Sequence, residues 1–197
     1  MLKDTILIWK FNRGSADALR EIYEKYRSTM LTVATALCND VHTAEDIVQD
    51  CFIAFAKTGR RLKIQGSLQA YLTTSIVNRA RDRYRAGKRQ PLNLDQAQMY
   101  PSQDDGPSVS AICNEQLQRL AGALADISPE QREVVVLHTR GQMTYKEIAD
   151  VQNVSIPTVQ RRYHSGLDRL RVLLDSEVKN ETPRKNRTVT QQHKCHA

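Results

Sequence analysis

Three acidic side chains near position 46 are the first candidates for chemistry in this sequence. Asp46 and Asp50 are four residues apart, so a helix places both carboxylates on one face, and Glu45 precedes them. Such carboxylates can act as general acid and base or bind a divalent metal. No complete catalytic or metal-binding set accompanies them. A surface that binds a partner, or the ordinary preference for acidic residues where a helix starts, explains them better than catalysis.

A second candidate lies near the C-terminal end, where His193, Cys195 and His196 have side chains that can bind zinc. The ligand set is incomplete, and a mobile tail would lose conformational entropy on binding the metal. We therefore predict no metal site, no cofactor and no catalytic residue, and thus a protein that is not an enzyme.

Basic residues gather between positions 66 and 89, where six of them accompany one acidic residue. Tyrosine can stack on an unpaired base, asparagine can hydrogen-bond a base edge, and arginine can follow the phosphate backbone, as single-strand binding requires. The alternative is a basic, solvated helix with a tyrosine in its core. The candidate residues on this helix are Tyr71, Ser75, Asn78, Arg79, Arg81, Arg83 and Arg85.

The sharpest pattern lies between Thr144 and Arg162, where a short capped helix, a turn and a second capped helix are predicted. This order is typical of a helix-turn-helix, and Asn153 stands at the turn, where a left-handed backbone is needed. An ordinary helical hairpin is the alternative. The candidates for duplex DNA contacts are Lys146, Thr158, Gln160, Arg161, Arg162, His164 and Ser165.

The elements that position these residues are predicted to be helices, because apolar residues recur at offsets of three and four. Three helices form an N-terminal module: Ser15 to Cys38, a second that Thr43 caps with Asp46 as its capping-box partner, ending at Thr58, and a third from Ser67 to Gly87. Four more follow, starting near Leu117, at Ser128 with Gln131 as capping-box partner, at Thr144, and from Ser155 to about Leu174. The predicted fold class is all-α, with two small helical domains joined by an extended acidic linker.

The predicted domain boundaries follow changes in composition. A first domain spans 1–89, an acidic, flexible linker 90–114, a second domain 115–175, and a disordered basic tail 176–197. Within the linker, residues 90–109 contain three Asp and neither Lys nor Arg.

Composition limits the class of protein further. The chain has 197 residues, a formal charge of +7 and a pI of about 9.4, which indicates an anionic partner and excludes a large multi-domain enzyme. No window approaches the roughly 20 apolar residues that a membrane span needs, so we expect a cytoplasmic protein without membrane insertion. The scattered cysteines Cys38, Cys51, Cys113 and Cys195 are predicted to be reduced thiols.

Taken in order, these motifs resemble a known family. Residues 44–52 (AEDIVQDCF) look like the region 2 motif, and Tyr71, Leu72, Asn78 and Asp82 follow its promoter-melting helix. Residues 128–132 (SPEQR) and the helix-turn-helix resemble region 4. Over roughly residues 10 to 175 the chain is similar to bacterial RNA polymerase sigma factors of the sigma-70 superfamily, in the small extracytoplasmic-function (ECF) group.

The resemblance implies a function, its partners and the roles of residues. A sigma factor binds core RNA polymerase through the β′ clamp helices and the β flap, directs it to promoter DNA, and often has an anti-sigma protein as a further partner. The −35 element would be read by the helix-turn-helix and the −10 element by the basic helix with the loop 58–67. The implied clamp contacts are Asp46, Gln49, Asp50 and Phe52. The loop adds Arg60, Arg61 and Lys63 to the residues that would bind the −10 DNA.

Two other classes remain open from the residues alone. A self-sufficient helix-turn-helix transcription factor with an N-terminal dimerisation or ligand-binding domain would bind duplex DNA without polymerase. A helical enzyme would need a cleft of converging catalytic groups, and the sequence offers none that we recognise.

Overall fold

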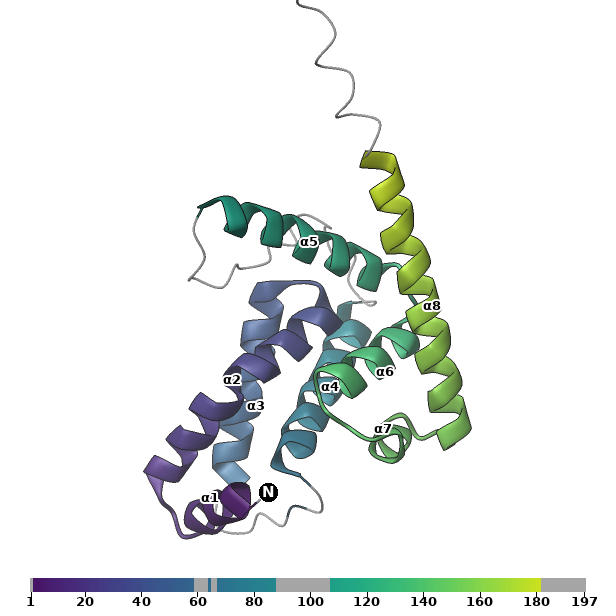
Figure 1. Ribbon diagram of the computed structural model, residues 1–197. Coiled ribbons are helices and arrows are strands. Elements are labelled where there is room, and N and C mark those ends of the chain that lie inside the picture. Colours follow the sequence, from purple (N-terminus) through teal and green to yellow (C-terminus); the bar gives the residue numbers. More distant parts are fainter. Residues whose placement is uncertain (1, 59–63, 65–66, 88–106, 182–197) are drawn as a thin grey trace, which may run out of the picture.

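The computed structural model describes residues 2–58, 64, 67–87 and 107–181, and in these ranges every regular element is an α-helix. The predicted all-α class with two helical regions is confirmed. Figure 1 shows α2, α3 and α4 side by side, with α5 crossing their ends and α8 in contact with α6. The helices are α1 (Leu2–Asn12), α2 (Ala16–Cys38), α3 (Val41–Thr58), α4 (Leu68–Gly87), α5 (Pro107–Ala125), α6 (Pro129–Thr139), α7 (Tyr145–Gln152) and α8 (Ile156–Glu181).

The N-terminal region comprises α1 to α4, one helix more than the sequence analysis predicted. The unpredicted helix α1 packs on α2 through Leu7 and Phe11, both almost fully buried. Phe11 stacks on Phe55 of α3 with the ring centres 4.7 Å apart. A spacing of four residues between two apolar side chains just before the Ser15 cap was the available signal for α1.

The capping residue predicted for α3 was wrong. The helix begins at Val41, and the Asp40 carboxylate accepts a hydrogen bond of 2.8 Å from the backbone N–H of Thr43. Thr43 and Asp46 therefore lie inside the helix and do not form its capping box. Aspartate caps a helix as well as threonine does, so two candidates three positions apart could not be ranked by residue type alone. The predicted end at Thr58 is confirmed. Ser67, where the next helix was predicted to start, caps α4 by accepting a hydrogen bond of 3.0 Å from the backbone N–H of Ala70.

The C-terminal region comprises α5 to α8 and contains the predicted helix-turn-helix. Thr144 and Glu147 form the expected capping box of α7, and Asn153 adopts the left-handed conformation (φ 52°, ψ 50°) at its end. Ile148, Ala149 and Val159 are buried, whereas Val154 is half-buried. Ser128 caps α6, but Gln131 does not complete a capping box, because its side chain donates to the Ser165 hydroxyl 2.9 Å away.

Two predicted boundaries differ from the observed helices. Helix α5 begins at Pro107, inside the segment assigned to the linker, and proline suits the first turn of a helix because it needs no N–H donor there. Helix α8 extends to Glu181, beyond the predicted tail boundary at 175. Its last turns are polar, and apolar periodicity detects only a helix face that packs. The rest of the linker to residue 106 and the tail from 182 lie outside the described residues.

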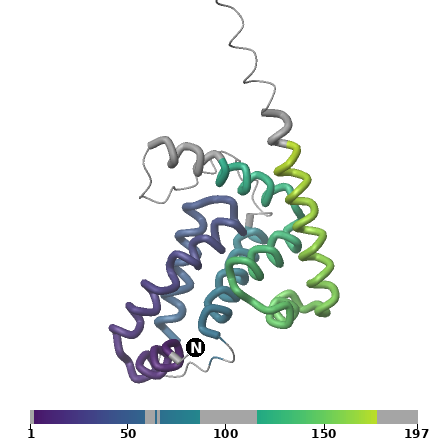
Figure 2. Tube along the Cα trace, in the orientation of Figure 1, coloured from purple at the N-terminus to yellow at the C-terminus, as the bar shows by residue number. Residues whose placement is uncertain are grey.

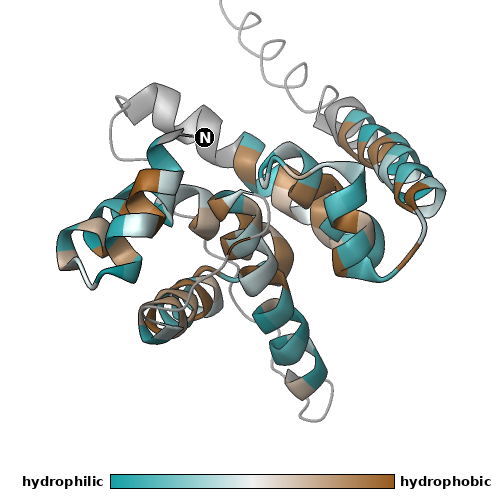
Figure 3. Ribbon diagram, turned by 90° about the horizontal axis from the view of Figure 1, so that it is seen from below, coloured by the Kyte–Doolittle hydropathy of each residue, from teal (hydrophilic) through white to brown (hydrophobic). Residues whose placement is uncertain are grey.

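The two regions pack directly against each other. Helix α6 contacts α2, and buried residues of α1 to α4 form one continuous core with Leu124 of α5, Val135 and Val136 of α6, and Leu170 of α8. The chain trace in Figure 2 shows α6 lying beside α4. Hydrophobic and hydrophilic residues are interleaved along the helices, as amphipathic packing requires (Figure 3). None of the described helices is long and apolar enough to span a membrane.

The left-handed turn of the helix-turn-helix gives a test of the fold. Asn153→Ala should lower the free energy of unfolding by about 1–2 kcal/mol. A Cβ is strained at positive φ, and alanine lacks the polar side chain with which asparagine offsets that strain. Asn153→Gly is the matched control and should cost less than about 0.5 kcal/mol. Urea unfolding followed by circular dichroism measures both. Equal losses for the two variants would contradict the assigned role of the backbone.

Candidate functional site

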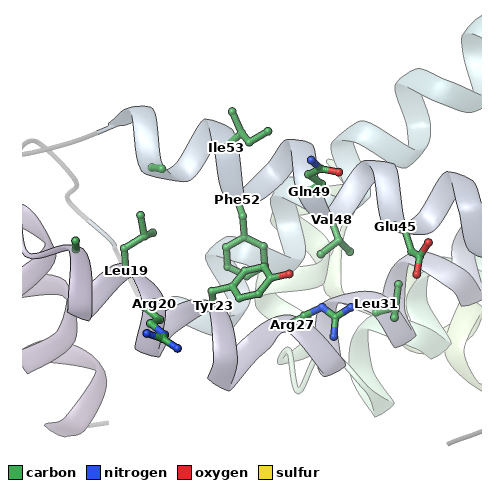
Figure 4. Close-up of a pocket in the computed structure, with 12 residues that line it drawn as sticks. Leu19, Arg20, Tyr23, Arg27, Leu31, Glu45, Val48, Gln49, Phe52 and Ile53 are labelled. Carbon is green, nitrogen blue, oxygen red and sulfur yellow. The ribbon is translucent and has the colours of Figure 1, made fainter. Parts of the chain in front are cut away.

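A groove of about 630 Å³ runs between α2 and α3. Tyr23 of α2 and Phe52 of α3 meet edge to face in it, with ring centres 4.9 Å apart (Figure 4). Of the residues predicted to bind polymerase, Gln49 and Phe52 line this groove, whereas Asp46 and Asp50 are not among its lining residues. Phe52 is also nearly buried, at 7% exposure, so it forms the floor of the groove.

The exposed apolar side chains of this groove were not among the residues predicted from the sequence. Tyr23 is 39% exposed and Ile53 is 44% exposed, and Leu19 and Leu31 add apolar area along α2. Tyr23 and Leu19 belong to the apolar face of their helix, which the period of the sequence does identify. Periodicity cannot show that part of such a face stays open to solvent. Basic and acidic side chains, Arg20, Arg27 and Glu45, also line the groove.

The arginines of α4 are all engaged by carboxylates. Arg79 lies 3.3 Å from Asp50, Arg83 lies 3.6 Å from Asp46, and Arg85 lies 3.8 Å from Asp82. The fourth, Arg81, pairs with Glu133 of α6. The structure therefore brings two carboxylates predicted to bind polymerase onto arginines predicted to bind DNA. The first three pairs are exposed, and exposed ion pairs contribute little to stability, so an external anion can displace them readily.

The three uncharged candidates on α4 differ in accessibility. Asn78 is exposed. Tyr71 is half-buried against the core, with its ring centre 6.1 Å from that of Phe55, and the Ser75 hydroxyl donates to the Tyr71 carbonyl within the helix. Asn78 is thus the candidate most open to a base. The candidate residues Arg60, Arg61 and Lys63 lie outside the described residues, as do His193, Cys195 and His196.

The second helix of the helix-turn-helix presents several candidates to solvent. Lys146 on α7 and Gln160, Arg161 and His164 on α8 are exposed. The other candidates have partners within the chain: the hydroxyls of Thr158 and Ser155 are 2.9 Å apart, and Ser165 accepts from Gln131. Arg162 is half-buried and donates to Gln152. The exposed donors and acceptors match those that read base edges and phosphates in a major groove.

Burial controls the chemistry of the two described cysteines. Desolvation raises the pKa of Cys38 and of Cys51 from 9.0 to about 11, and it outweighs nearby arginines that favour the thiolate. Cys51 belongs to the core of the N-terminal region, whereas Cys38 is half-buried at the end of α2. Both are free thiols and poor nucleophiles near neutral pH.

Comparison with protein families gives two matches in the order that the motifs predicted. Residues 22–90 match sigma-70 region 2, and residues 117–170 match sigma-70 region 4. The first match covers most of α2 together with α3 and α4. The second runs from within α5 through α6 and the helix-turn-helix and ends within α8.

Individual relatives agree with the family matches over most of the chain. The chain is 25% identical to the RNA polymerase sigma factor CarQ of Myxococcus xanthus (84% of this chain, 94% of CarQ). It is 24% identical to the ECF sigma factor SigW of Bacillus subtilis (83% of this chain, 92% of SigW). Its fold is similar to CnrH in complex with the cytosolic domain of CnrY, with a TM-score of 0.67 at 23% identity, covering 88% and 97% of the two chains. RpoE of Bartonella quintana, solved with the anti-sigma factor NepR, has a TM-score of 0.63 at 23% identity, covering 79% and 98%.

The raised thiol pKa values predict slow alkylation in the native protein. Because the thiolate is the reactive form, Cys38 and Cys51 should react with iodoacetamide at pH 9 much more slowly than the same residues in urea. Their rates should rise as the pH approaches 11, where half of each thiol is ionised. Mass spectrometry of the labelled peptides measures each site. Native rates at pH 9 equal to those in urea would refute the assigned burial.

Proposed function

The chain belongs to the ECF group of sigma-70 factors, which direct transcription initiation, and we propose that it does so by reading the −35 and −10 promoter elements and assisting strand separation. The observation that carries this proposal is the pair of region 2 and region 4 matches in one chain, each of which includes a helix with exposed candidate residues for DNA binding. The chemistry proposed is binding alone, without a catalytic step, in the cytoplasm.

Polymerase docking is assigned to the groove between α2 and α3. Its apolar floor and exposed rim, Phe52, Tyr23 and Ile53, suit a partner helix with an apolar stripe, because buried aromatic and aliphatic anchors dominate binding energy. Asp46 and Asp50 lie on the same helix and would favour basic partner residues. The proposed partner here is the β′ clamp helices, and the β flap would bind the C-terminal region.

Promoter reading is divided between the two regions. Gln160, Arg161 and His164 of α8, with Lys146 of α7, would contact the −35 duplex. Asn78 and the arginines of α4 would hold the unpaired −10 strand, with Tyr71 as a stacking surface at their base. Stacking is worth about 1–3 kcal/mol per base, comparable to opening one base-pair step, so capturing a base can favour local strand separation.

An anti-sigma protein is the further partner that we propose. Support comes from two solved structures of similar fold, RpoE with NepR and CnrH with the cytosolic domain of CnrY. The exposed apolar groove gives such a protein a surface on which to compete with polymerase.

Polymerase binding should depend on Ile53. Ile53→Asp should weaken association with core polymerase at least about tenfold, because it places a charge where an apolar contact forms. Ile6→Asp is the matched control, since Ile6 on α1 is similarly exposed (50%) and lies outside the groove. Fluorescence titration of labelled protein with core polymerase measures both. Equal affinities of the two variants for core polymerase would show that the groove is not the polymerase-binding surface.

Substitutions on α8 that remove a phosphate contact should change promoter affinity in a different way from those that remove a base contact. Arg161→Ala should weaken all promoters alike and reduce the salt slope by about one unit, whereas Gln160→Ala should cost about 1–3 kcal/mol at one base pair. Holoenzyme binding to a set of singly substituted promoters, repeated at several salt concentrations, separates the two patterns. Unaltered binding and sequence profile in both variants would show that α8 does not read the −35 element.

A further inference from the structure

One side of α4 is covered by the C-terminal region. Val77 is fully buried, and the buried residues of its cluster all come from α6, the following turn, α7 and α8: Val134, Leu137, Met143, Ile148, Ala149 and Val159. Gln69 of α4 donates to the Gly141 carbonyl across the same contact, 3.2 Å away. The helix assigned to promoter melting is therefore packed against the region assigned to the −35 element.

Glu133 of α6 is the centre of the polar contacts between these regions. It is a buried acidic residue, 8% exposed, and its carboxylate accepts from both Nε and Nη2 of Arg81, the former at 2.9 Å. Arg81 also donates from Nη1 to the Val151 carbonyl at the end of α7. A bidentate, largely desolvated pair of this kind is stronger and more selective in geometry than the exposed pairs of Arg79, Arg83 and Arg85.

The same carboxylate is connected to α8. Gln152 donates to Glu133 Oε1 at 2.9 Å, and Gln152 Oε1 accepts from Arg162 Nη1 at 2.6 Å. A continuous chain of hydrogen bonds thus joins Arg81 of α4 to Arg162 of α8. Each of these arginines is a candidate for contacting DNA, and each is held by a partner within the protein.

The contact between the regions also contains unfavourable features. Among the described residues, two buried side-chain atoms have no hydrogen-bond partner, the Thr73 hydroxyl and Arg132 Nε. Thr73 lies against the C-terminal region, because a Cβ added to Gly141 would be 3.0 Å from its methyl carbon, and Arg132 donates across the contact to the Leu37 carbonyl. Buried polar atoms without partners lower the stability of the arrangement that buries them. Separation of the regions would rehydrate both.

We propose that Glu133 forms an intramolecular latch that keeps the two regions closed over α4 in the free chain and that DNA phosphates open it by taking over Arg81 and Arg162. The inference rests on the proposed function for the identity of the displacing ligand. The latch itself rests on the contacts between Glu133, Arg81 and Gln152. Arg81 and Arg162 can then either hold the two regions closed or bind nucleic acid, but they cannot do both at once.

Alkylation of Cys38 measures closure in the free chain without DNA or polymerase. Cys38 follows Leu37, whose carbonyl accepts from Arg132, so departure of the C-terminal region uncovers it. Glu133→Gln should raise the Cys38 rate at least about tenfold, since it removes the charge that holds Arg81. Glu130→Gln is the matched control, an exposed glutamate on the same helix. Cys51, inside the N-terminal core, is the internal reference for unfolding.

A second variant distinguishes opening of the latch from misfolding of the C-terminal region. Val77→Ser leaves that region's sequence intact and weakens the contact from the α4 side, so it should raise the Cys38 rate as Glu133→Gln does. Faster Cys38 labelling in both variants, with Cys51 unchanged, supports the latch. Cys38 rates equal to wild type in both variants would overturn it.

Binding of a fluorescent oligothymidine to the free chain separates the latch from the proposed function. If opening uncovers a nucleic-acid surface on α4, both variants should bind the oligonucleotide at least about tenfold more tightly than wild type and Glu130→Gln do. Faster Cys38 labelling without tighter binding would support the latch and reject the nucleic-acid role of α4. Unchanged labelling rejects the latch whatever the oligonucleotide does.

Discussion

The contact of α4 with the C-terminal region is the constraint on which the rest of the arrangement depends. Val77 is buried by α6, α7 and α8, and Arg81 is held by Glu133 beside it. An apolar side chain gives this contact its burial energy, and a bidentate ion pair gives it a single geometry. Because α6 also packs on α2, the two regions share a continuous core in this closed arrangement.

The charge of α4 has two uses in this arrangement. Its arginines are matched by Asp50, Asp46, Asp82 and Glu133 within the chain, and the same arginines are the basic surface of a region 2 helix. Exposed ion pairs are weak, and an external anion can replace the carboxylate. They therefore reduce non-specific binding of anions to α4 but still allow a specific anionic ligand to bind. The buried pair is different, because separating it requires the regions to move apart. A DNA-binding protein with a basic helix can in this way remain compact before it meets its ligand.

Local features were largely predictable, and contacts between distant segments were not. Thr144, Glu147 and Asn153 are recognisable because capping and left-handed turns depend on residue type and on neighbours a few positions away. The polymerase candidates Gln49 and Phe52, which the resemblance implied, line the groove between α2 and α3. Tyr23 and Ile53 line it too but were not candidates, because their exposure depends on how the two helices pack. The pairing of Arg81 with Glu133, 52 positions apart, has no local signal at all. The charge pattern located the arginines, and only the fold identified their partners.

If the two regions of this sigma factor are closed in the free chain and separate when they bind promoter DNA, the distance between α2 and α8 must change. Pulsed electron paramagnetic resonance with spin labels at Ser28 on α2 and Asp168 on α8, both exposed, measures that distance. We expect one short, narrow distance distribution in the free chain and a longer one in the complex with core polymerase and promoter DNA. The same distribution in both states would show that the regions do not separate.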